Sequence, residues 1–174
     1  MKDHSYSHLQ KVLHWLSAVV ILWALISGFY VALFEVSAAS KAWVAFFNVS
    51  LTTVFIPLFI WRFYLALRTR SSHVGQPRSF AESLAVIAHQ AIYLAVIIVL
   101  ITGVLMMDRP ITVFDLFFIP QPLQDPYLIG LFFTVHVVSC AVLGLLVALH
   151  VAAVVKHEVA GRRVLKRMLW SAPK

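Results

Sequence analysis

Two histidines in the last long apolar stretch of this chain have the spacing of a paired site. His136 and His150 lie 14 residues apart within the apolar run Gln121–Val155. In an α-helix that spacing is about 21 Å along the axis and falls only about 40° short of four full turns. Both imidazoles would then share one helix face, near opposite ends of an apolar slab about 30 Å thick. Imidazoles inside membrane segments are rare and usually functional, so the pattern indicates two metal or cofactor levels between which electrons or protons move.

The same 14-residue spacing recurs in each of the three earlier apolar stretches. The pairs are His14 with Gly28, Asn48 with Arg62, and His89 with Gly103. If the stretches alternate in direction, every one of them marks both levels on nearly the same face. A glycine at a level lets a flat ring approach the backbone closely, so the pattern is what a bundle enclosing two stacked planar cofactors requires.

The composition excludes an aqueous globular protein. Of the 174 residues 61% are hydrophobic and 12% charged, which is about half the charge of an average soluble domain, and the mean hydropathy is +0.90. The net charge of +7 is explained by membrane topology once the basic residues are assigned to the two sides of the membrane, so no nucleic-acid partner is expected. The single cysteine, Cys140, lies in an apolar run and is expected to pack between helices.

The elements that must position these residues are four apolar spans, approximately residues 12–34, 42–67, 84–107 and 127–155. We predict an all-α integral membrane four-helix bundle, with residues 1–174 as one membrane domain and the cofactors between the helices. The aromatic loop 108–126 is expected to fold against the membrane surface as a cap. A basic tail, 156–174, follows. Its segment His157–Trp170 has two interpretations, a basic amphipathic helix on the membrane surface or a frayed polar tail.

The basic residues divide unequally between the two sides of such a bundle. Twelve lie toward one side, eleven in the termini and the middle loop and one (Arg62) near that end of the second span, and two lie in the other loops. This positive-inside bias predicts that both termini are cytoplasmic. It places His14, His89 and His150 near the cytoplasmic (inner) face, and Asn48 and His136 near the outer face. The two basic residues on the outer side are Lys41 and Arg109; those on the inner side are Lys2, Lys11, Arg62, Arg68, Arg70, Arg78, Lys156, Arg162, Arg163, Lys166, Arg167 and Lys174.

The donor set favours haem over a bare metal ion. Zinc would need three or four ligands at one level, usually with cysteine or carboxylate, and the spans hold no suitable carboxylate. Two histidines from facing helices fit b-type haem, whose iron takes two axial imidazoles. His14 and His150 meet this need at the inner level. His136 is a candidate ligand at the outer level, where its expected partner is missing.

Other polar residues near the inner level have two interpretations each. Arg62 either pairs with haem propionates or a quinone, or extends to the lipid headgroups. His89 is expected to form hydrogen bonds or to line a quinone site rather than to bind iron. His157 either belongs to a site or reaches the membrane surface. The histidines outside these levels, His4, His8 and His73, are expected to be solvated.

One set of residues along the chain carries a resemblance to a known family. It consists of Tyr6, Ser7, Leu9, Gln10, His14, Trp15, Arg62, Ile92, Tyr93, Gly103, Val104, Leu105, Met106, Met107, His136, His150 and His157. With these residues the sequence resembles the bacterial cytochrome b561 family over nearly its whole length. The resemblance implies two haems b held by four helices, with inner ligands at His14 and His150 and an outer ligand at His136. It also implies electron transfer between membrane quinone, such as ubiquinone, and an outer partner, in the bacterial inner membrane. At least one similar branch oxidises superoxide and reduces ubiquinone.

The chain departs from that family at one position. Asn48 stands where the family carries its second-span histidine, and an amide is a poor ligand for haem iron. The outer haem is then absent, or held by His136 alone with an open face, or ligated by a substitute such as Met106 or Met107. Asn48 could also hydrogen-bond a small molecule bound at the open face. We expect one haem, with the outer one lost or much altered, which weakens the case for superoxide oxidation.

Two functions from different classes follow. The leading hypothesis is a quinone-linked membrane electron carrier, an oxidoreductase if it has superoxide oxidase-like activity, with bis-histidine haem at the cytoplasmic side. The alternative is a haem-containing accessory or anchor subunit of a larger electron-transfer complex, which the missing outer ligand and the aromatic loop 108–126 favour. A proton or solute transporter is less consistent with the sequence, which has no intramembrane carboxylates and no inverted repeat of broken helices.

Overall fold

Four long helices make up most of the computed structural model, which describes residues 7–71 and 80–168. They are α1 (His8–Leu33), α2 (Ala38–Ser71), α3 (Phe80–Leu105) and α4 (Pro126–Val159). Each is long and apolar enough to cross a membrane, and leucine, valine and isoleucine side chains cover their outer surfaces. The prediction of an all-α membrane four-helix bundle is thus confirmed. The smaller elements are β1 (Ile111–Val113), β2 (Phe117–Ile119) and the 3₁₀-helix η1 (Val164–Arg167).

All four helices continue past the predicted apolar spans at the same end of the bundle. Helices α1 and α3 begin four residues earlier than the spans, and α2 and α4 end four residues later. Helix α1 begins with a capping box, in which Ser7 and Gln10 each accept a backbone N–H from the other. A helix can extend beyond the hydrocarbon where water or capping groups satisfy its terminal backbone, so apolar length alone underestimates these helices.

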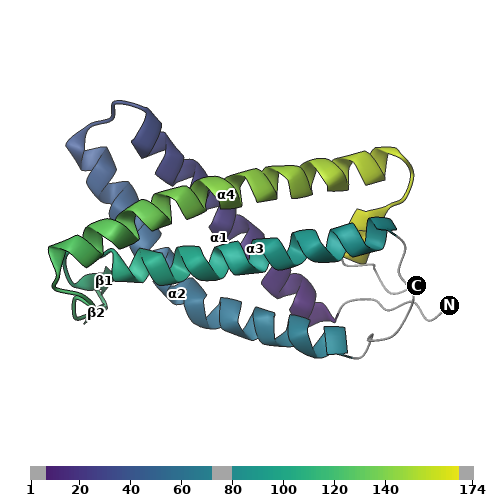
Figure 1. The fold of residues 1–174 in the computed structure, drawn as a ribbon, viewed down its shortest axis with the longest axis horizontal. Helices are drawn as coiled ribbons and strands as arrows, with labels where there is room; N and C mark the ends of the chain where they lie inside the picture. The colour runs from purple at the N-terminus through teal and green to yellow at the C-terminus, as the bar shows by residue number, and fades with distance from the viewer. Residues whose placement is uncertain (1–6, 72–79, 169–174) are drawn as a thin grey trace.

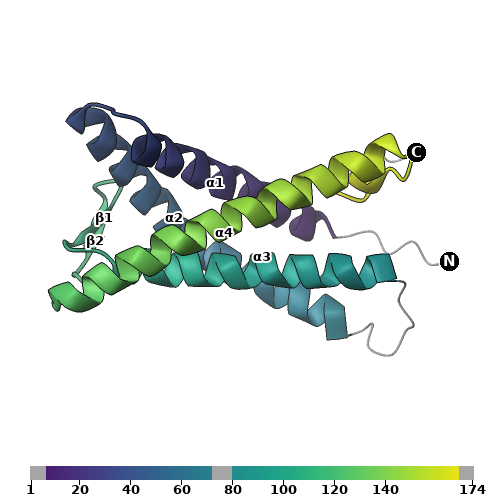
Figure 2. The ribbon, with the colours of Figure 1, turned by 45° about the horizontal axis from the view of Figure 1, so that its top comes forward.

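The helices form two pairs with an apolar layer at mid-depth. Helix α1 packs on α2 and α3 packs on α4, with fewer contacts between α2 and α3, and α4 crosses α1 in two views (Figures 1 and 2). The buried layer includes Phe55, Val96 and Leu143, each 2% exposed. Each of these three lies midway between the two residues of the 14-residue pair on its own helix, seven positions from either; we call the members of these pairs the marked positions. The layer therefore separates the two levels.

The segment after α3 folds as a short antiparallel hairpin against the N-terminal half of α2. Its turn places Phe114 and Asp115 at φ values of 49° and 57°, and Ile111 and Val113 are buried with Met107. Ser50 of α2 holds the turn, since its hydroxyl donates to the Thr112 carbonyl (3.2 Å) and accepts the Phe114 N–H (3.0 Å). The hairpin lies at the opposite end of the bundle from the start of α1 and the end of α4 (Figure 1). The expected cap is a strand hairpin that the apolar spans did not predict.

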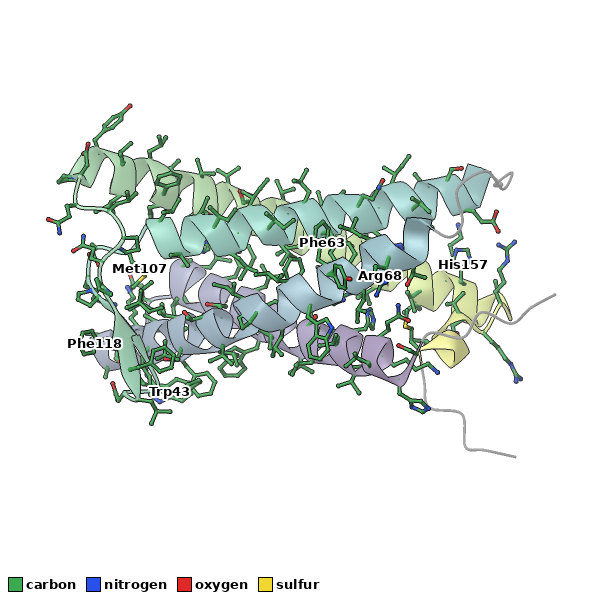
Figure 3. The ribbon with its side chains drawn as sticks, turned by 90° about the horizontal axis from the view of Figure 1, so that it is seen from below. Trp43, Phe63, Arg68, Met107, Phe118 and His157 are labelled. Carbon is green, nitrogen blue, oxygen red and sulfur yellow. The ribbon has the colours of Figure 1, made fainter. Side chains whose placement is uncertain are left out.

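The chain beyond α4 turns back toward the start of α1. The turn contains Gly161 and Arg163 at φ values of 79° and 38°, and the Trp15 indole N–H donates to the Met168 carbonyl (3.0 Å). Neither interpretation of this tail describes it, because the helix breaks after Val159 and the segment then packs on α1. Trp170 lies outside the described residues. Figure 3 places His157 and Arg68 at this end of the molecule, away from the hairpin.

Candidate cofactor site

At the inner level, the structure brings His14 and Arg62 into direct contact. The Arg62 guanidinium donates to Nδ1 of His14 at 3.1 Å. The guanidinium carbon also lies 5.2 Å from the centre of the Tyr93 ring of α3, an arrangement in which an aromatic face stabilises a cation. Three helices therefore hold the Arg62 charge within the bundle, and the arginine does not simply extend to the surface.

His89 and His150 form the second contact at this level. Their ring centres lie 5.1 Å apart with the ring planes at 71°. Nδ1 of His89 lies 2.7 Å from the Ala85 carbonyl. A carbonyl oxygen can only accept, so this nitrogen carries the proton and Nε2 of His89 presents a lone pair. The contact between Arg62 and Tyr93 joins this pair to the first one, because Tyr93 lies about one helical turn after His89 on α3.

The inner donor set fits a bis-histidine haem, with one adjustment. His14 on α1 and His150 on α4 supply imidazoles from different helix pairs, and Arg62 is suited to a propionate. Arginine only donates, so in the observed contact Nδ1 of His14 accepts and Nε2 carries the proton. Iron binding through Nε2 requires the opposite tautomer. Arg62 must therefore release Nδ1 before His14 can ligate in that way.

The outer level contains a cavity between the helix pairs. It has a volume of about 600 Å³, within the range of about 300–1,000 Å³ that is common for ligand sites. Its lining includes the marked outer residue of each helix, namely Gly28, Asn48, Gly103 and His136. A Cβ on Gly28 would meet nothing within 4 Å. The structure thus brings the four predicted outer positions to one cavity.

His136 is held in an orientation suited to a ligand. Its Nδ1 lies 3.1 Å from both the Val99 carbonyl and the Thr102 hydroxyl oxygen, and that hydroxyl donates to the Ile98 carbonyl at 2.7 Å. Nδ1 of His136 therefore carries the proton. The lone pair of Nε2, the atom that would bind a metal, accepts from the Cys140 thiol at 3.5 Å. A Cβ on Gly103 would lie 3.1 Å from Cε1 of this ring, so glycine makes room for the imidazole.

Asn48 lies on α2, in the other helix pair. The Ser27 hydroxyl contacts its Oδ1 at 3.0 Å, and within residues 7–71 and 80–168 its amide nitrogen makes no hydrogen bond. Met106 and Met107 also line the cavity. Met107 is buried beneath the hairpin with Ile111 and Val113 (Figure 3). Among the residues that line this cavity, His136 supplies the one imidazole.

Sequence reasoning missed the groups that orient these side chains. Cys140 lies one turn after His136, with Sγ 3.5 Å from Nε2, and its spacing could have indicated the shared face. Thr102 and Ser27 directly precede the two marked glycines, which was a weaker signal. The Val99 and Ala85 carbonyls have no sequence signal at all.

The remaining predicted residues lie outside the two levels. His157 is half-buried at the inner end, and its side chain makes no hydrogen bond within the part of the chain that is described. His8 is exposed at the start of α1. His4 and His73 fall outside the described residues. Among the residues described, no three histidine, cysteine or acidic side chains gather closely enough to hold a bare metal ion.

Comparison with known proteins identifies a family for this chain. The protein-family model described as prokaryotic cytochrome b561 matches residues 5–171. No curated protein shows a significant match. The family match spans both levels, all four helices and the tail that packs on α1.

Proposed function

Because the chain belongs to the prokaryotic cytochrome b561 family, we propose that it carries electrons between the quinone pool and a partner or small redox molecule. Family membership makes it a multi-pass bacterial membrane protein, a b-type cytochrome of electron transfer. The proposed carrier is a haem b at the inner level, ligated by His14 and His150. The supporting observation is the pair of contacts at this level, His14 with Arg62 and His89 with His150, to which all four helices contribute.

Each inner residue has a distinct proposed role. Haem supplies reversible one-electron chemistry, and the protein sets its orientation and potential. His14 and His150 would hold the haem iron. Arg62 would exchange its contact with His14 for a haem propionate, to which its planar fork is suited.

His89 and His157 are the proposed quinone-site residues. The Nε2 lone pair of His89 can accept a proton from a quinol hydroxyl, because its Nδ1 is fixed on the Ala85 carbonyl. His157, half-buried at the same end, can contact a quinone at the membrane boundary. We place both termini on the cytoplasmic side of the inner membrane, as the twelve-to-two division of basic residues favours.

Spectroscopy of ligand variants tests the inner haem. In the purified protein, the His14→Ala and His150→Ala variants should each lose the low-spin reduced-minus-oxidised signal, while His8→Ala serves as the matched control on α1. Haem b per polypeptide is measured by pyridine haemochrome. A full low-spin spectrum in either ligand variant contradicts the assignment, and a wild-type protein without haem contradicts the proposal as a whole.

The quinone role has a separate kinetic test. A short-chain ubiquinol analogue should reduce the inner haem, and His89→Asn should slow this reduction by roughly 10²-fold, the usual lower range for loss of a general base. Reduction by dithionite should leave the same final spectrum in both proteins. An unchanged rate with quinol would assign His89 to packing against His150 alone.

An accessory subunit is the second candidate. The hairpin exposes a group of large apolar side chains, with Leu116 at 82% and Phe118 at 72%, beside an outer level that lacks the second imidazole. Such a subunit would show little electron transfer alone. Steady quinol oxidation by the isolated protein, with a soluble acceptor or with superoxide generation as readout, favours the carrier, and its absence from a haem-loaded protein favours the subunit.

A further inference from the structure

The outer cavity combines one oriented imidazole with an amide that has a free donor. His136 reaches the cavity from α4, and Asn48 reaches it from α2 in the other helix pair. His136 is fixed through Nδ1 by the Val99 carbonyl and the Thr102 oxygen. The Ser27 hydroxyl holds one end of the Asn48 amide, and the nitrogen at its other end makes no hydrogen bond among the residues described.

We propose that the outer level binds a haem b through His136 alone and that Asn48 acts as a hydrogen-bond donor to a small neutral diatomic ligand at the open axial position. This inference rests on the proposed cytochrome function. A distal pocket's donors and steric access decide whether a haem binds such ligands. An Asn48 amide in place of an imidazole supplies the donor while leaving the position open.

The geometry of the cavity supports haem rather than loss of the cofactor. The cavity keeps a volume of about 600 Å³, and Gly28 and Gly103 leave it without side chains at two of its four marked positions. Any side chain on Gly103 would press on the His136 ring, because its Cβ would lie 3.1 Å from Cε1. The level therefore keeps its open space although one imidazole, rather than two, lines it.

Two other sulfur atoms at this level, those of Cys140 and Met107, are poorly placed to close the open position. The Cys140 thiol contacts the Nε2 atom of His136 that would bind iron, so it must release that atom when haem binds, and it lies on the side that the imidazole occupies. Met107 is buried with Ile111 and Val113 beneath the hairpin. Its displacement into an axial position would uncover that apolar cluster.

Carbon monoxide is the probe for the open position. In the dithionite-reduced, haem-loaded protein we expect two haems per chain, of which one binds carbon monoxide. Asn48→His should abolish this binding and convert the outer haem to a low-spin form. His136→Ala should remove the carbon monoxide-reactive haem while the inner low-spin signal remains.

A second variant tests the donor itself. Asn48→Leu should keep the stoichiometry of carbon monoxide binding, because the axial position stays open. Its C–O stretching frequency should rise and its dissociation should become roughly two- to tenfold faster, the effect of losing one hydrogen bond. Thr134→Val is the control, since Thr134 lies two residues from His136 but is exposed on the outer surface of α4.

Three results would overturn the inference. One low-spin haem with no carbon monoxide binding means that the outer level lacks haem, and leaves the inner-level function intact. Two low-spin haems without carbon monoxide binding mean that a second protein ligand exists, which Met106→Leu and Met107→Leu would identify. Unchanged C–O frequency in Asn48→Leu removes the role of the amide.

Discussion

The inner and outer levels of this bundle are built from equivalent positions but differ in what lies at those positions. At the inner level the marked side chains contact one another directly, with His14 on Arg62 and His89 beside His150. At the outer level the marked positions surround a cavity of about 600 Å³ with a single imidazole. The inner level is rich in ligands, and the outer level is rich in space.

This difference separates two requirements of a haem site that are usually met together. Ligand identity depends on single side chains, whereas a cavity depends on small residues and on the spread of the helix pairs. Losing one ligand therefore need not close the space. The apolar layer of Phe55, Val96 and Leu143 lies between the levels, so each level can change without repacking the other.

The largest expected effect comes from filling the outer level. In Gly103→Leu, a Cβ that begins 3.1 Å from Cε1 of His136 must displace the ring from the Val99 carbonyl. We expect the carbon monoxide-reactive haem to disappear and the inner low-spin signal to stay unchanged, at a cost of about 1–3 kcal/mol in stability. Haem per polypeptide measures the loss of the outer haem, and the reduced-minus-oxidised spectrum measures the inner low-spin signal. Gly130→Ala, where an added Cβ meets nothing within 4 Å, is the control.

Survival of the carbon monoxide-reactive haem in Gly103→Leu would mean that His136 does not bind it from this position. Loss of the inner signal as well would break the comparison in another way, since it would show that the two levels are not independent.

Next in size is the loss of the hydrogen bonds that fasten the hairpin. Ser50 is fully buried, and Ser50→Ala leaves the Thr112 carbonyl and the Phe114 N–H without their partner. We expect about 1–3 kcal/mol of destabilisation, together with earlier thermal release of the outer haem than of the inner one. Absorbance melting of the two haem signals in detergent separates them.

Ser40→Ala is the comparison for that measurement. Its hydroxyl bonds only to the exposed Ser37, so its effect should stay within about 0.5 kcal/mol. Equal shifts of both haem signals in Ser50→Ala would argue that the hairpin stabilises the whole bundle rather than the outer level.

A smaller effect should appear in the inner haem potential. Arg62→Leu removes a positive charge that lies beside His14. Loss of this charge stabilises the oxidised haem, which is the more positive of the two redox states. A charge at ~10 Å and an effective dielectric constant of ~20 contributes about 1.7 kcal/mol, or about 70 mV for one electron. The inner midpoint potential should fall by about this amount in a redox titration, and the outer one by about half or less.

Arg62→Lys keeps the charge and should recover most of the potential, although it loses the planar fork. If Arg62→Leu left the potential unchanged, the guanidinium would lie far from the haem, and its role would be limited to the contacts with His14 and Tyr93.

The helices and both levels could be predicted because they depend on local periodicity. Apolar runs identify the helices, and the 14-residue spacing identifies positions such as His14 and Gly28 that share a face whatever the helix packs against. The contacts that tune the site are not local. Ser50 meets Phe114 across 64 positions of sequence, and His136 meets the Val99 carbonyl across 37.

The tail shows the same limit at the inner level. Its charge pattern was compatible with a surface helix or a frayed end, because periodicity does not report a distant acceptor. The Trp15 indole meets the Met168 carbonyl 153 positions away, and Gly161 and Arg163 adopt the backbone conformation that reverses the chain. The pairing of His14 with Arg62 was also not predicted, since the expected partner of Arg62 was a propionate, a quinone or a headgroup.

The smallest expected effect concerns this tail. Trp15→Phe keeps the aromatic ring and removes the N–H that bonds to Met168, so segment 160–168 should lose about 0.5–1.5 kcal/mol of docking free energy. Limited proteolysis should then cut the tail roughly two- to tenfold faster, with the outer level unaffected. The control is Trp61→Phe, whose exposed ring lies on the surface of α2. If the inner haem spectrum also shifts in Trp15→Phe, the docked tail shapes the surroundings of His14 and is part of the inner level; an unchanged cutting rate would mean that η1 is held by Glu158 alone, through its bond to the Leu165 N–H.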